Sequence, residues 1–305
     1  MLALSEEEVR SRLDAGALIS ALELAFRDRY DSTVMPPRTH LQLAGGIFLA
    51  MPCYDRAGDV LGMKLVMVHP NGEAHSSVEA TYMLLDPETS RPKLMIAANH
   101  LTDVRTAATS AMATKFLARA DVKTLGIFGT GRLARAHLTA LPLVRSFERV
   151  LICGRSQGAT QEFIVASSSN LMLQPASADE CAAESDVICT CTTSSEPLFK
   201  GNMLRLGTHL NLVGAFQPHT REVDSLAIKR ARLFVDTYDG VLSEAGDVLI
   251  PLKEGVINRE DIAGDLHELV SGTRRRRNND DDITVFKSVG CALEDLVAAE
   301  VLMSS

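Results

Sequence analysis

Apolar residues near the start of the chain recur at the spacing of a helix. The positions that share this spacing are Val9, Leu13, Leu18, Ile19, Leu22 and Phe26. Because an α-helix turns about once every 3.6 residues, this spacing places them on one face. Ser5 followed by Glu8 has the form of a capping box, which satisfies free amides at a helix start. We therefore predict one or two opening helices that end near Tyr30, before the break at Pro36 and Pro37.

From Thr39 to Ala98 the pattern changes to short apolar runs separated by turn residues. The turn clusters are Ala44-Gly45-Gly46, Asp55–Gly58, Pro70-Asn71-Gly72 and Asp86–Ser90. Runs punctuated in this way predict an antiparallel sheet. The alanine-rich stretch from Asn99 to Arg119 has high helix propensity, and we expect it to connect two domains.

From Asp121 onward, candidate strands alternate with helical segments. The strands are Lys123–Phe128, Arg149–Cys153, Asp186–Thr190, His209–Val213 and Leu233–Asp236. Helical crossovers between such strands indicate a parallel, doubly wound sheet. A charged loop from Thr273 to Asp282 follows, and its charges cancel in a way that is typical of a solvated loop. The segment Ile283–Met303 returns to a helical pattern, which we expect to pack on the first domain.

These elements predict an α/β chain of two domains. Residues 1–115 together with 283–305 form an α+β domain, and residues 116–282 form a Rossmann-type domain with a doubly wound parallel sheet. A length of 305 residues suits two domains. A hydrophobic content of 46% is typical of a globular chain with a sizeable core.

Charge and composition exclude several kinds of partner. The formal net charge of -8 provides no basic surface for a nucleic-acid backbone. No apolar run approaches the roughly 18–20 residues of a membrane span, and the start of the chain lacks the pattern of a signal peptide. The six cysteines have no metal-binding spacing with histidine partners, so we interpret them as buried thiols and predict no metal. We predict a cytoplasmic chain.

The strongest chemical motif lies directly after the first strand of the second domain. It reads Gly129-Thr130-Gly131-Arg132-Leu133-Ala134. The first glycine permits a tight turn, the second lets backbone amides approach a pyrophosphate, and the alanine allows close packing of helix on strand. A glycine turn without a ligand is the alternative, but the strand before it and the helix after it favour a dinucleotide site.

The end of the second strand indicates which dinucleotide binds. An NAD site usually has an acidic residue here, whereas this chain has Gly154, Arg155 and Ser156. A guanidinium and a hydroxyl suit a 2′-phosphate, so NADP(H) is favoured over NAD(H). The alternative is that Arg155 is an ordinary solvated loop residue. Thr190 and Thr192 either line the nicotinamide pocket or are ordinary β-branched strand residues.

Further motifs resemble the ornithine cyclodeaminase/mu-crystallin family. They are Leu101–Ala108, Val213-Gly214-Ala215, Pro218, Arg221–Asp224, Glu244–Asp247 and Thr284–Gly290, and they follow the family's order over most of the chain. The resemblance implies a homodimer built through the first domain. It also implies an active site between this domain and the dinucleotide domain, which makes the first domain the substrate and dimerisation domain.

The resemblance implies three cations around a substrate carboxylate, namely Arg38, Lys64 and Arg105. The fork of an arginine grips a planar carboxylate through two hydrogen bonds, which agrees with this role. Taken singly, each cation is as easily an ordinary surface residue. By similarity alone, we also assign Glu244 to the catalytic site. The residues assigned to the cofactor on the same ground are Ser77, Thr106, Val213, Lys287 and Ser288.

Two positions depart from the family's pattern. Cyclodeaminases of the family have an acidic residue where this chain has Phe216, and a phenyl ring can neither accept a proton nor pair with an ammonium group. Leu133 stands where many relatives have glutamine, which removes one side-chain contact to the cofactor. Phe216 instead suits a substrate with an apolar ring opposite its carboxylate, so we count it in the catalytic site as an apolar wall.

These features lead to a hypothesis and to alternatives. The hypothesis is an oxidoreductase that reduces Δ1-pyrroline-2-carboxylate or Δ1-piperideine-2-carboxylate to L-proline or L-pipecolate, with hydride transfer to C2 of a protonated iminium. The mu-crystallin branch of the family, which also lacks the acid, reduces such ketimines with NADPH. The alternatives are an ornithine cyclodeaminase, an alanine dehydrogenase-like enzyme, and a non-catalytic protein that binds NADPH and a small ligand.

Overall fold

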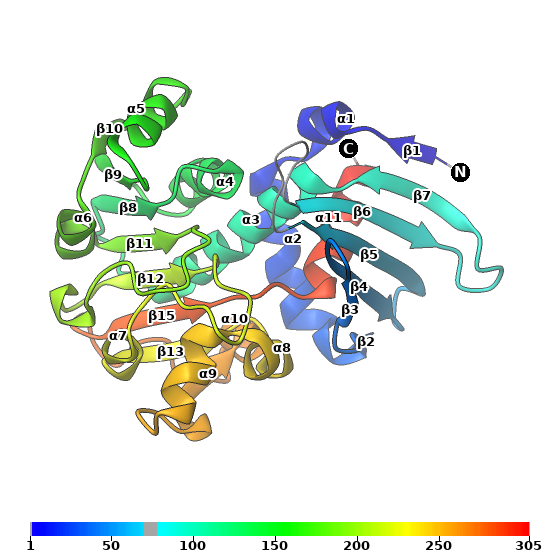
Figure 1. The fold of residues 1–305 in the computed structure, drawn as a ribbon. Helices are drawn as coiled ribbons and strands as arrows, with labels where there is room; N and C mark the ends of the chain where they lie inside the picture. Colours follow the sequence, from blue (N-terminus) through cyan, green and yellow to red (C-terminus); the bar gives the residue numbers. More distant parts are fainter. Residues whose placement is uncertain (1, 70–77, 305) are drawn as a thin grey trace. The chain divides into compact units, whose positions relative to one another are not determined.

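The computed structural model describes residues 2–69 and 78–304, and the chain divides into two compact units. Unit 1 comprises Met1–Thr106 and Cys291–Ser305, and unit 2 comprises Ala107–Gly290. Helices and strands alternate over most of the chain, as Figure 1 shows. The predicted α/β class is confirmed.

Unit 1 consists of a mainly antiparallel sheet and the helices that cover one of its faces. Its elements are β1 (Leu2–Leu4), α1 (Glu6–Arg12), α2 (Ala15–Asp28), η1 (Tyr30–Ser32), β2 (Thr33–Val34), β3 (Thr39–Leu43), β4 (Gly46–Asp55), β5 (Val60–Val68), β6 (Val78–Leu85), β7 (Pro92–Ala97) and α11 (Ala292–Ser304). The strand order is β1-β7-β6-β5-β4-β2, and β3 pairs with β4. The predicted capping box is present, because Ser5 and Glu8 bond reciprocally at the start of α1.

The two faces of this sheet differ. Along β4, β5 and β6 buried residues alternate with half-buried ones, the pattern of a sheet covered on one side. Helix α11 packs on β4, β5 and β6 and against α2, so it covers the inner face. The residues that point the other way form what we call the outer face; they include Phe48, Ala50, Pro52, Tyr54, Leu61, Met63, Leu65, Met67, Met83 and Met95. They are half-buried or exposed, although most are apolar.

Unit 2 follows from helix α3 (Asn99–Leu117), which begins in unit 1. Its further elements are β8 (Thr124–Phe128), α4 (Arg132–Ala140), η2 (Leu141–Leu143), β9 (Arg149–Cys153), α5 (Gln157–Val165), β10 (Met172–Pro175), α6 (Ala178–Glu184), β11 (Val187–Thr190), η3 (Gly201–Met203), β12 (His209–Leu212), α7 (Ser225–Lys229), β13 (Ala231–Val235), α8 (Tyr238–Glu244), α9 (Gly246–Lys253), η4 (Arg259–Asp261), β14 (Ile262–Asp265), α10 (Leu266–Ser271) and β15 (Ile283–Lys287).

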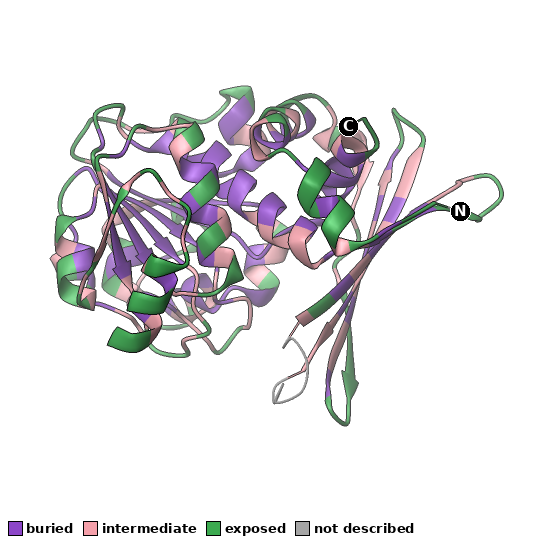
Figure 2. Cartoon of the chain, turned by 90° about the horizontal axis from the view of Figure 1, so that it is seen from above, coloured by how far each residue is buried: buried purple, intermediate pink, exposed green. Residues whose placement is uncertain are grey.

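The strands of unit 2 form one parallel sheet in the order β10-β9-β8-β11-β12-β15-β13-β14. Chain order runs outward from β8 through β9 and β10 on one side and through β11 and β12 on the other, beyond which β15 is inserted before β13. β8 and β11 therefore mark the switch point at which doubly wound sheets bind ligands. The central strands β8, β11, β12 and β15 are buried at every position, and Figure 2 shows them purple throughout. The five predicted strands and the doubly wound arrangement are confirmed.

One prediction about the end of the chain is wrong. We expected Ile283–Met303 to be helical and to belong to the first domain, but Ile283–Lys287 is strand β15, paired with β12 and β13 in unit 2. Only the part from Ala292 onward is a helix of unit 1. The physical reason is that a short apolar run buried on both sides has no periodicity that distinguishes a strand from a helix.

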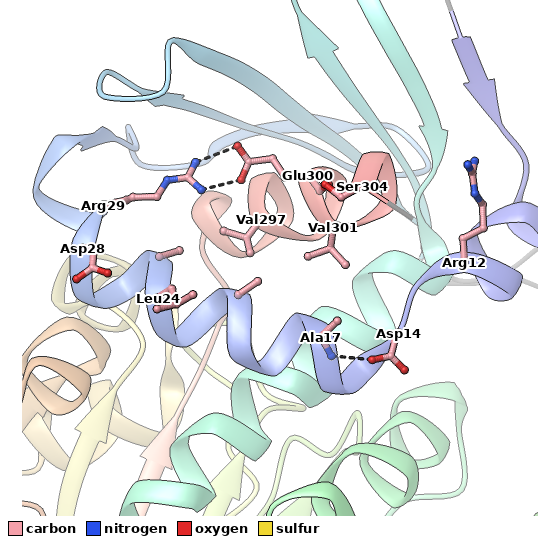
Figure 3. A pocket seen from close by; sticks show the side chains of 12 residues that line it. Arg12, Asp14, Ala17, Leu24, Asp28, Arg29, Val297, Glu300, Val301 and Ser304 are labelled. Carbon is pink, nitrogen blue, oxygen red and sulfur yellow. Dashed lines mark hydrogen bonds and ion pairs between the residues drawn. The ribbon is translucent and has the colours of Figure 1, made fainter.

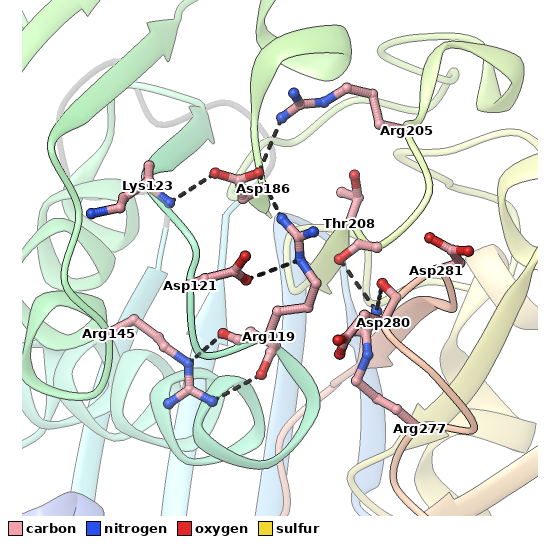
Figure 4. Close-up of polar contacts among 12 residues, drawn as sticks. Arg119, Asp121, Lys123, Arg145, Asp186, Arg205, Thr208, Arg277, Asp280 and Asp281 are labelled. Atoms are coloured by element: carbon pink, nitrogen blue, oxygen red, sulfur yellow. Dashed lines mark hydrogen bonds and ion pairs between the residues drawn. The ribbon is translucent and has the colours of Figure 1, made fainter.

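The charged loop before β15 also has a more definite structure than expected. We predicted a solvated loop, yet the guanidinium of Arg277 is half-buried and donates to the carbonyl oxygen of Leu117, at 2.7 Å, and to that of Gly207, at 3.3 Å. Leu117 is the last residue of α3, so Arg277 satisfies a free carbonyl at a helix end. Nearby, Asp186 accepts from the amide of Lys123 and from Arg119, as Figure 4 shows.

Candidate active site

Lys64 lies on the inner face of the unit 1 sheet, among residues that are otherwise mostly apolar. It is paired across the sheet with Met51 on β4 and with Tyr82 on β6, and its side chain is 1% exposed. Burying an ammonium group is costly unless a carboxylate partners it. The ammonium Nζ donates to Oδ1 of Asp295 on α11 at 2.8 Å. The pattern of β5 thus places one cation inside the core of unit 1.

Arg105 joins this ion pair from helix α3. Its Nε donates to the same Oδ1 of Asp295 at 3.0 Å, and its Nη1 donates to Oε2 of Glu294 at 2.5 Å. Glu294 and Asp295 are fully buried, and Arg105 is 5% exposed. Although burial opposes it, the two carboxylates raise the pKa of Arg105. Arg105 is therefore a fixed cation.

Arg38, half-buried between β2 and β3, is the third cation of this region. Burial, followed by the charges of Arg105 and Arg38, lowers the pKa of Lys64 to about 8, while Asp295 opposes this shift. We name the group of Arg38, Lys64, Arg105, Glu294 and Asp295 the cation cluster. The cluster thus brings three cations and two carboxylates together within unit 1.

The glycine-rich turn of unit 2 has the geometry that its sequence predicts. Gly129 has a φ of 115°, and a Cβ there would lie 2.6 Å from the carbonyl oxygen of Cys191, so only glycine fits. A Cβ at Gly131 would meet nothing within 4 Å, which leaves the backbone open to a close-lying group. Gly131 caps α4 without a side-chain hydrogen bond, and Ala134 is fully buried. Free amides at a helix start suit a pyrophosphate.

The end of β9 lies beside this turn. The amide of Gly129 donates to the carbonyl oxygen of Cys153 at 2.9 Å, and a Cβ at Gly154 would lie 2.8 Å from the side chain of Thr130. Arg155 and Ser156, the next residues, are exposed. The Ser156 hydroxyl accepts from the amide of Ala159 at 3.2 Å and so caps α5. The structure therefore brings together the two segments that we assigned to the cofactor.

A second group of buried charges connects the carboxyl ends of β11, β12 and β15. Glu222 accepts from Thr190 Oγ1 at 2.7 Å, and from the amide and the hydroxyl of Thr192 at 2.8 and 2.7 Å. Asp247 accepts from the amide of Glu222 at 2.7 Å and from Lys287 Nζ at 2.9 Å. We name Glu222, Asp247 and Lys287 the strand-end network. Burial and the charge of Asp247 raise the pKa of Glu222, whereas Lys287 and the threonine hydroxyls lower it.

The strand-end network gives several predicted cofactor residues other partners. Thr190 and Lys287 are fully buried, and their polar atoms bond to Glu222 and to Asp247. Ser288 is also buried, and its hydroxyl donates to Asp236 at 2.9 Å. Val213 is buried at the end of β12. These side chains hold the strand ends together, and their contact with a cofactor stays a prediction.

The remaining predicted residues lie in different surroundings. Phe216 is half-buried and packs against the core of unit 2, and Glu244 is buried at the end of α8. Thr106 lies within α3, where its hydroxyl donates to the carbonyl oxygen of Thr102 at 2.8 Å. Leu133 lies half-buried in the first turn of α4, next to Arg132, which is exposed. Ser77 lies outside the described residues.

The buried carboxylates are not among the residues that the sequence predicts for the site. Glu222 and Asp247 lie within motifs of the family resemblance, whereas Glu294 and Asp295 lie outside them. A signal existed for the second pair, because they are two acidic residues side by side in a helix that is otherwise buried and mainly apolar. Charged residues are rarely fully buried unless they are paired, so their position in such a helix points to buried cations.

Other features of the described residues lie outside these two sites. In the described part of the chain no group of histidine, cysteine and acidic side chains could hold a metal ion. The hollow lies between α2 and α11 and includes the Arg29–Glu300 ion pair, but none of the predicted site residues lines it. No helix within residues 2–69 and 78–304 is both long and apolar enough to cross a membrane.

Comparison with known proteins shows the family of this chain. The model of the ornithine cyclodeaminase/mu-crystallin family matches residues 1–305. A Δ1-pyrroline-2-carboxylate reductase of Bacillus cereus is 34% identical over 311 aligned positions, which cover 99% of this chain and 95% of the relative.

Solved structures show the same fold over the full length. The Δ1-pyrroline-2-carboxylate reductase of Thermococcus litoralis, in complex with NADH and L-proline, is 36% identical with a TM-score of 0.96, covering 100% of this chain and 97% of that one. An archaeal alanine dehydrogenase dimer with bound NAD is 30% identical with a TM-score of 0.94, covering 100% and 95%. The chain belongs to the ornithine cyclodeaminase/mu-crystallin family.

Proposed function

We propose that this chain is an NADPH-dependent reductase of cyclic ketimines that carry a carboxylate on the imine carbon. Its substrates are Δ1-pyrroline-2-carboxylate or Δ1-piperideine-2-carboxylate, and its products are L-proline or L-pipecolate. The observation that carries the proposal is the cation cluster, in which Lys64 and Arg105 share Asp295 and Arg38 lies near enough to act on Lys64, a grouping of cations that suits a substrate carboxylate. The family's name and the cluster fit several of its activities, and Phe216 favours reduction among them.

In this proposal, unit 1 binds the substrate. The substrate carboxylate binds at the cation cluster, where Arg38 supplies a guanidinium fork and Lys64 a point charge. Lys64 and Arg105 are already held by Asp295, so they lose little side-chain freedom when the ligand binds. The carboxylate fixes the orientation of the ring and therefore of C2, the carbon to be reduced.

Unit 2 binds the cofactor through the glycine-rich turn and the end of β9. The geometry fits a dinucleotide, because Gly131 leaves room beside the backbone and the amides at the start of α4 lack a side-chain cap. The reduced nicotinamide, when bound, supplies the hydride that C2 accepts. Because the iminium nitrogen is already protonated, this chain needs no general acid at that step.

Phe216 supports reduction over deamination. It stands where cyclodeaminases of the family have an acid, so water activation at this position has no base. The half-buried phenyl ring of Phe216 offers an apolar surface to the substrate ring, whose atoms other than the imine nitrogen are all carbon. The relatives named Δ1-pyrroline-2-carboxylate reductase, one of them solved with NADH and L-proline, support the same choice.

NADP(H) is the proposed cofactor because Arg155 and Ser156 follow β9 beside the glycine-rich turn. Arg155 is exposed, and no hydrogen bond or ion pair to another described residue holds its guanidinium. A 2′-phosphate at the start of α5 would meet this cation and the helix amides together. Because two related structures hold NADH and NAD, the preference of this chain has to be measured directly.

A homodimer through the outer face is part of the proposal. Open apolar patches on soluble proteins often mark protein contacts, and the outer face is mainly apolar along three adjoining strands. A related alanine dehydrogenase is a dimer. Sedimentation at micromolar concentration should give twice the mass of the chain, and the mass of a single chain would contradict this part.

A dehydrogenase of open-chain amino acids is the second candidate, because a structure with a TM-score of 0.94 is an alanine dehydrogenase. One assay separates the candidates. Each cyclic ketimine is mixed with NADPH or NADH and the loss of nicotinamide absorbance is followed, beside pyruvate with ammonia and beside ammonia release from ornithine. Fast NADPH oxidation with a cyclic ketimine is expected. Turnover only with pyruvate and ammonia, or with ornithine, would overturn the proposal.

A further inference from the structure

Two adjacent carboxylates near the start of α11 do not contact the solvent. Glu294 and Asp295 lie in the first turn of the helix and are fully buried. Leu293 and Leu296, on either side, are also fully buried, so the surroundings are apolar apart from the cation cluster. Desolvating two carboxylates is unfavourable unless specific cations or donors compensate. The burial of both carboxylates therefore indicates a role beyond stabilising the helix.

The bonds of Asp295 go to two cations from different elements. Its Oδ1 accepts from Lys64 on β5 at 2.8 Å and from Arg105 on α3 at 3.0 Å. Its Oδ2 is buried and has no hydrogen-bond partner among the described residues. Glu294 holds the other end of the same guanidinium through Nη1. One carboxylate thus fixes the distance between the two cations, and the other fixes the rotation of Arg105.

The charges around Lys64 make its protonation depend on Asp295. Arg38 and Arg105 repel its ammonium charge, and Asp295 is the carboxylate that bonds to it. Glu294 faces the cluster from α11, and the described titratable groups nearby include the Tyr82 hydroxyl on β6, the Cys53 thiol on β4, Cys291 before α11 and Glu300 on α11. Lys64 is protonated at neutral pH by a small margin, since its pKa is about 8. Loss of the Asp295 charge would lower that pKa further.

We propose that Asp295 is a positioning residue for the substrate carboxylate, because it orients Lys64 and Arg105 and keeps Lys64 charged. Glu294 assists by fixing Arg105. This inference rests on the proposed ketimine reduction and deepens it. Asp295 touches neither substrate nor cofactor in this role. It acts through the two cations, so its removal changes how the substrate binds and the pH at which binding fails.

The test is Asp295→Asn, which keeps the shape and removes the charge. At neutral pH we expect kcat/KM for the cyclic ketimine to fall at least tenfold, mainly through KM. The decline of kcat/KM with rising pH should also begin at lower pH than in the unchanged protein, because Lys64 then loses its proton earlier. Titration of the substrate is common to both proteins and cancels in the comparison.

Asp55→Asn is the matched control. Asp55 is a buried carboxylate of the same unit that accepts from Arg29 at 2.8 Å and from Ser32 at 2.9 Å, away from the cation cluster. This variant should lose stability but keep the pH at which kcat/KM declines. Asp295→Glu, which restores the charge in a longer side chain, should return that pH to its original value while KM stays raised. If Asp295→Asn does not fold, Asp295→Glu still tests the positioning role, because a raised KM is expected and an unchanged KM would contradict the inference. Glu294→Gln, which leaves the Lys64 bond intact, should raise KM through Arg105 without moving the pH of the decline.

A second measurement does not depend on activity. Lysine labelled with ¹³C at Cε gives a signal for Lys64, identified by its absence in Lys64→Arg, and the pH titration of this signal reports the charge. We expect the titration to move to lower pH in Asp295→Asn, and an unchanged titration would overturn the inference. If the unchanged protein reduces no ketimine, the proposed function fails, yet this titration still decides whether Asp295 keeps Lys64 charged.

Discussion

The cation cluster of unit 1 and the strand-end network of unit 2 are built from the same kind of bond. Each has a fully buried lysine–carboxylate pair, at 2.8 Å for Lys64 and Asp295 and at 2.9 Å for Lys287 and Asp247. They differ in the balance between cations and carboxylates. Cations outnumber carboxylates in the first, whereas in the second the carboxylates outnumber the cation and accept from the chain's own amides and hydroxyls.

The difference teaches how to distinguish a binding site from a structural one. Carboxylates that accept from the amides and hydroxyls of the same chain stabilise a conformation, whereas a group in which cations outnumber carboxylates suits an anionic ligand. If this interpretation is right, damage to the strand-end network should reduce stability alone, whereas damage to the cation cluster should reduce substrate affinity as well. The following predictions test that separation.

The largest expected effect is a loss of stability in Asp247→Asn. The substitution leaves the ammonium of Lys287 buried without a charged partner, so the free energy of unfolding should fall by about 3–5 kcal/mol. Urea denaturation measures it. Glu148→Gln is the control, because it breaks the exposed pair with Lys123 and should cause no measurable change. Full stability of Asp247→Asn with lost turnover would show that the network acts in catalysis instead.

A smaller effect, on binding alone, is expected for Arg38→Ala. Removing one charge-assisted hydrogen bond to the substrate carboxylate should raise KM for the ketimine about 10- to 100-fold. The Kd for NADPH and the urea midpoint should stay as they are, since Arg38 is half-buried and lies in unit 1. Arg27→Ala, at an exposed arginine of α2, is the control. Steady-state kinetics that match the unchanged protein would remove Arg38 from the site.

The smallest effect is expected for Arg155→Ala and concerns the cofactor. KM for NADPH should rise about tenfold through loss of a charged contact to the 2′-phosphate, while KM for NADH stays constant. NADH serves as the internal control, because it lacks the phosphate. Equal changes for both cofactors would mean that Arg155 contacts a part they share or supports the loop.

Much of the fold was predictable because its periodicity is regular. The alternation of strand and helix from Asp121 predicted the parallel sheet, and the glycine-rich turn had a definite chemical reason for each small residue. Strand β15 was not predictable in this way. A run that is buried on both faces carries no alternation, and its partners β12 and β13 are far away in the sequence.

The candidate site was predictable in part. Lys64 and Arg105 came from the resemblance, and the structure shows that they share one carboxylate oxygen. Asp295 could not be found by spacing, because it is separated from Arg105 by the whole of unit 2. For Lys287 the reverse holds. A motif identified the residue, but the motif did not indicate that its side chain is buried in the core. Ion pairs between distant segments depend on the fold, which local pattern does not contain.

The division of unit 1 into two stretches has a consequence for the order of synthesis. A ribosome makes Lys64 and Arg105 early, then all of unit 2, and only afterwards the helix that carries Glu294 and Asp295. Until those last residues emerge, the ammonium group on β5 and the guanidinium on α3 are without their carboxylates. Unit 2, by contrast, has every charge of its strand-end network as soon as β15 is made. The part proposed to hold the cofactor can therefore mature first, and the substrate site is completed last.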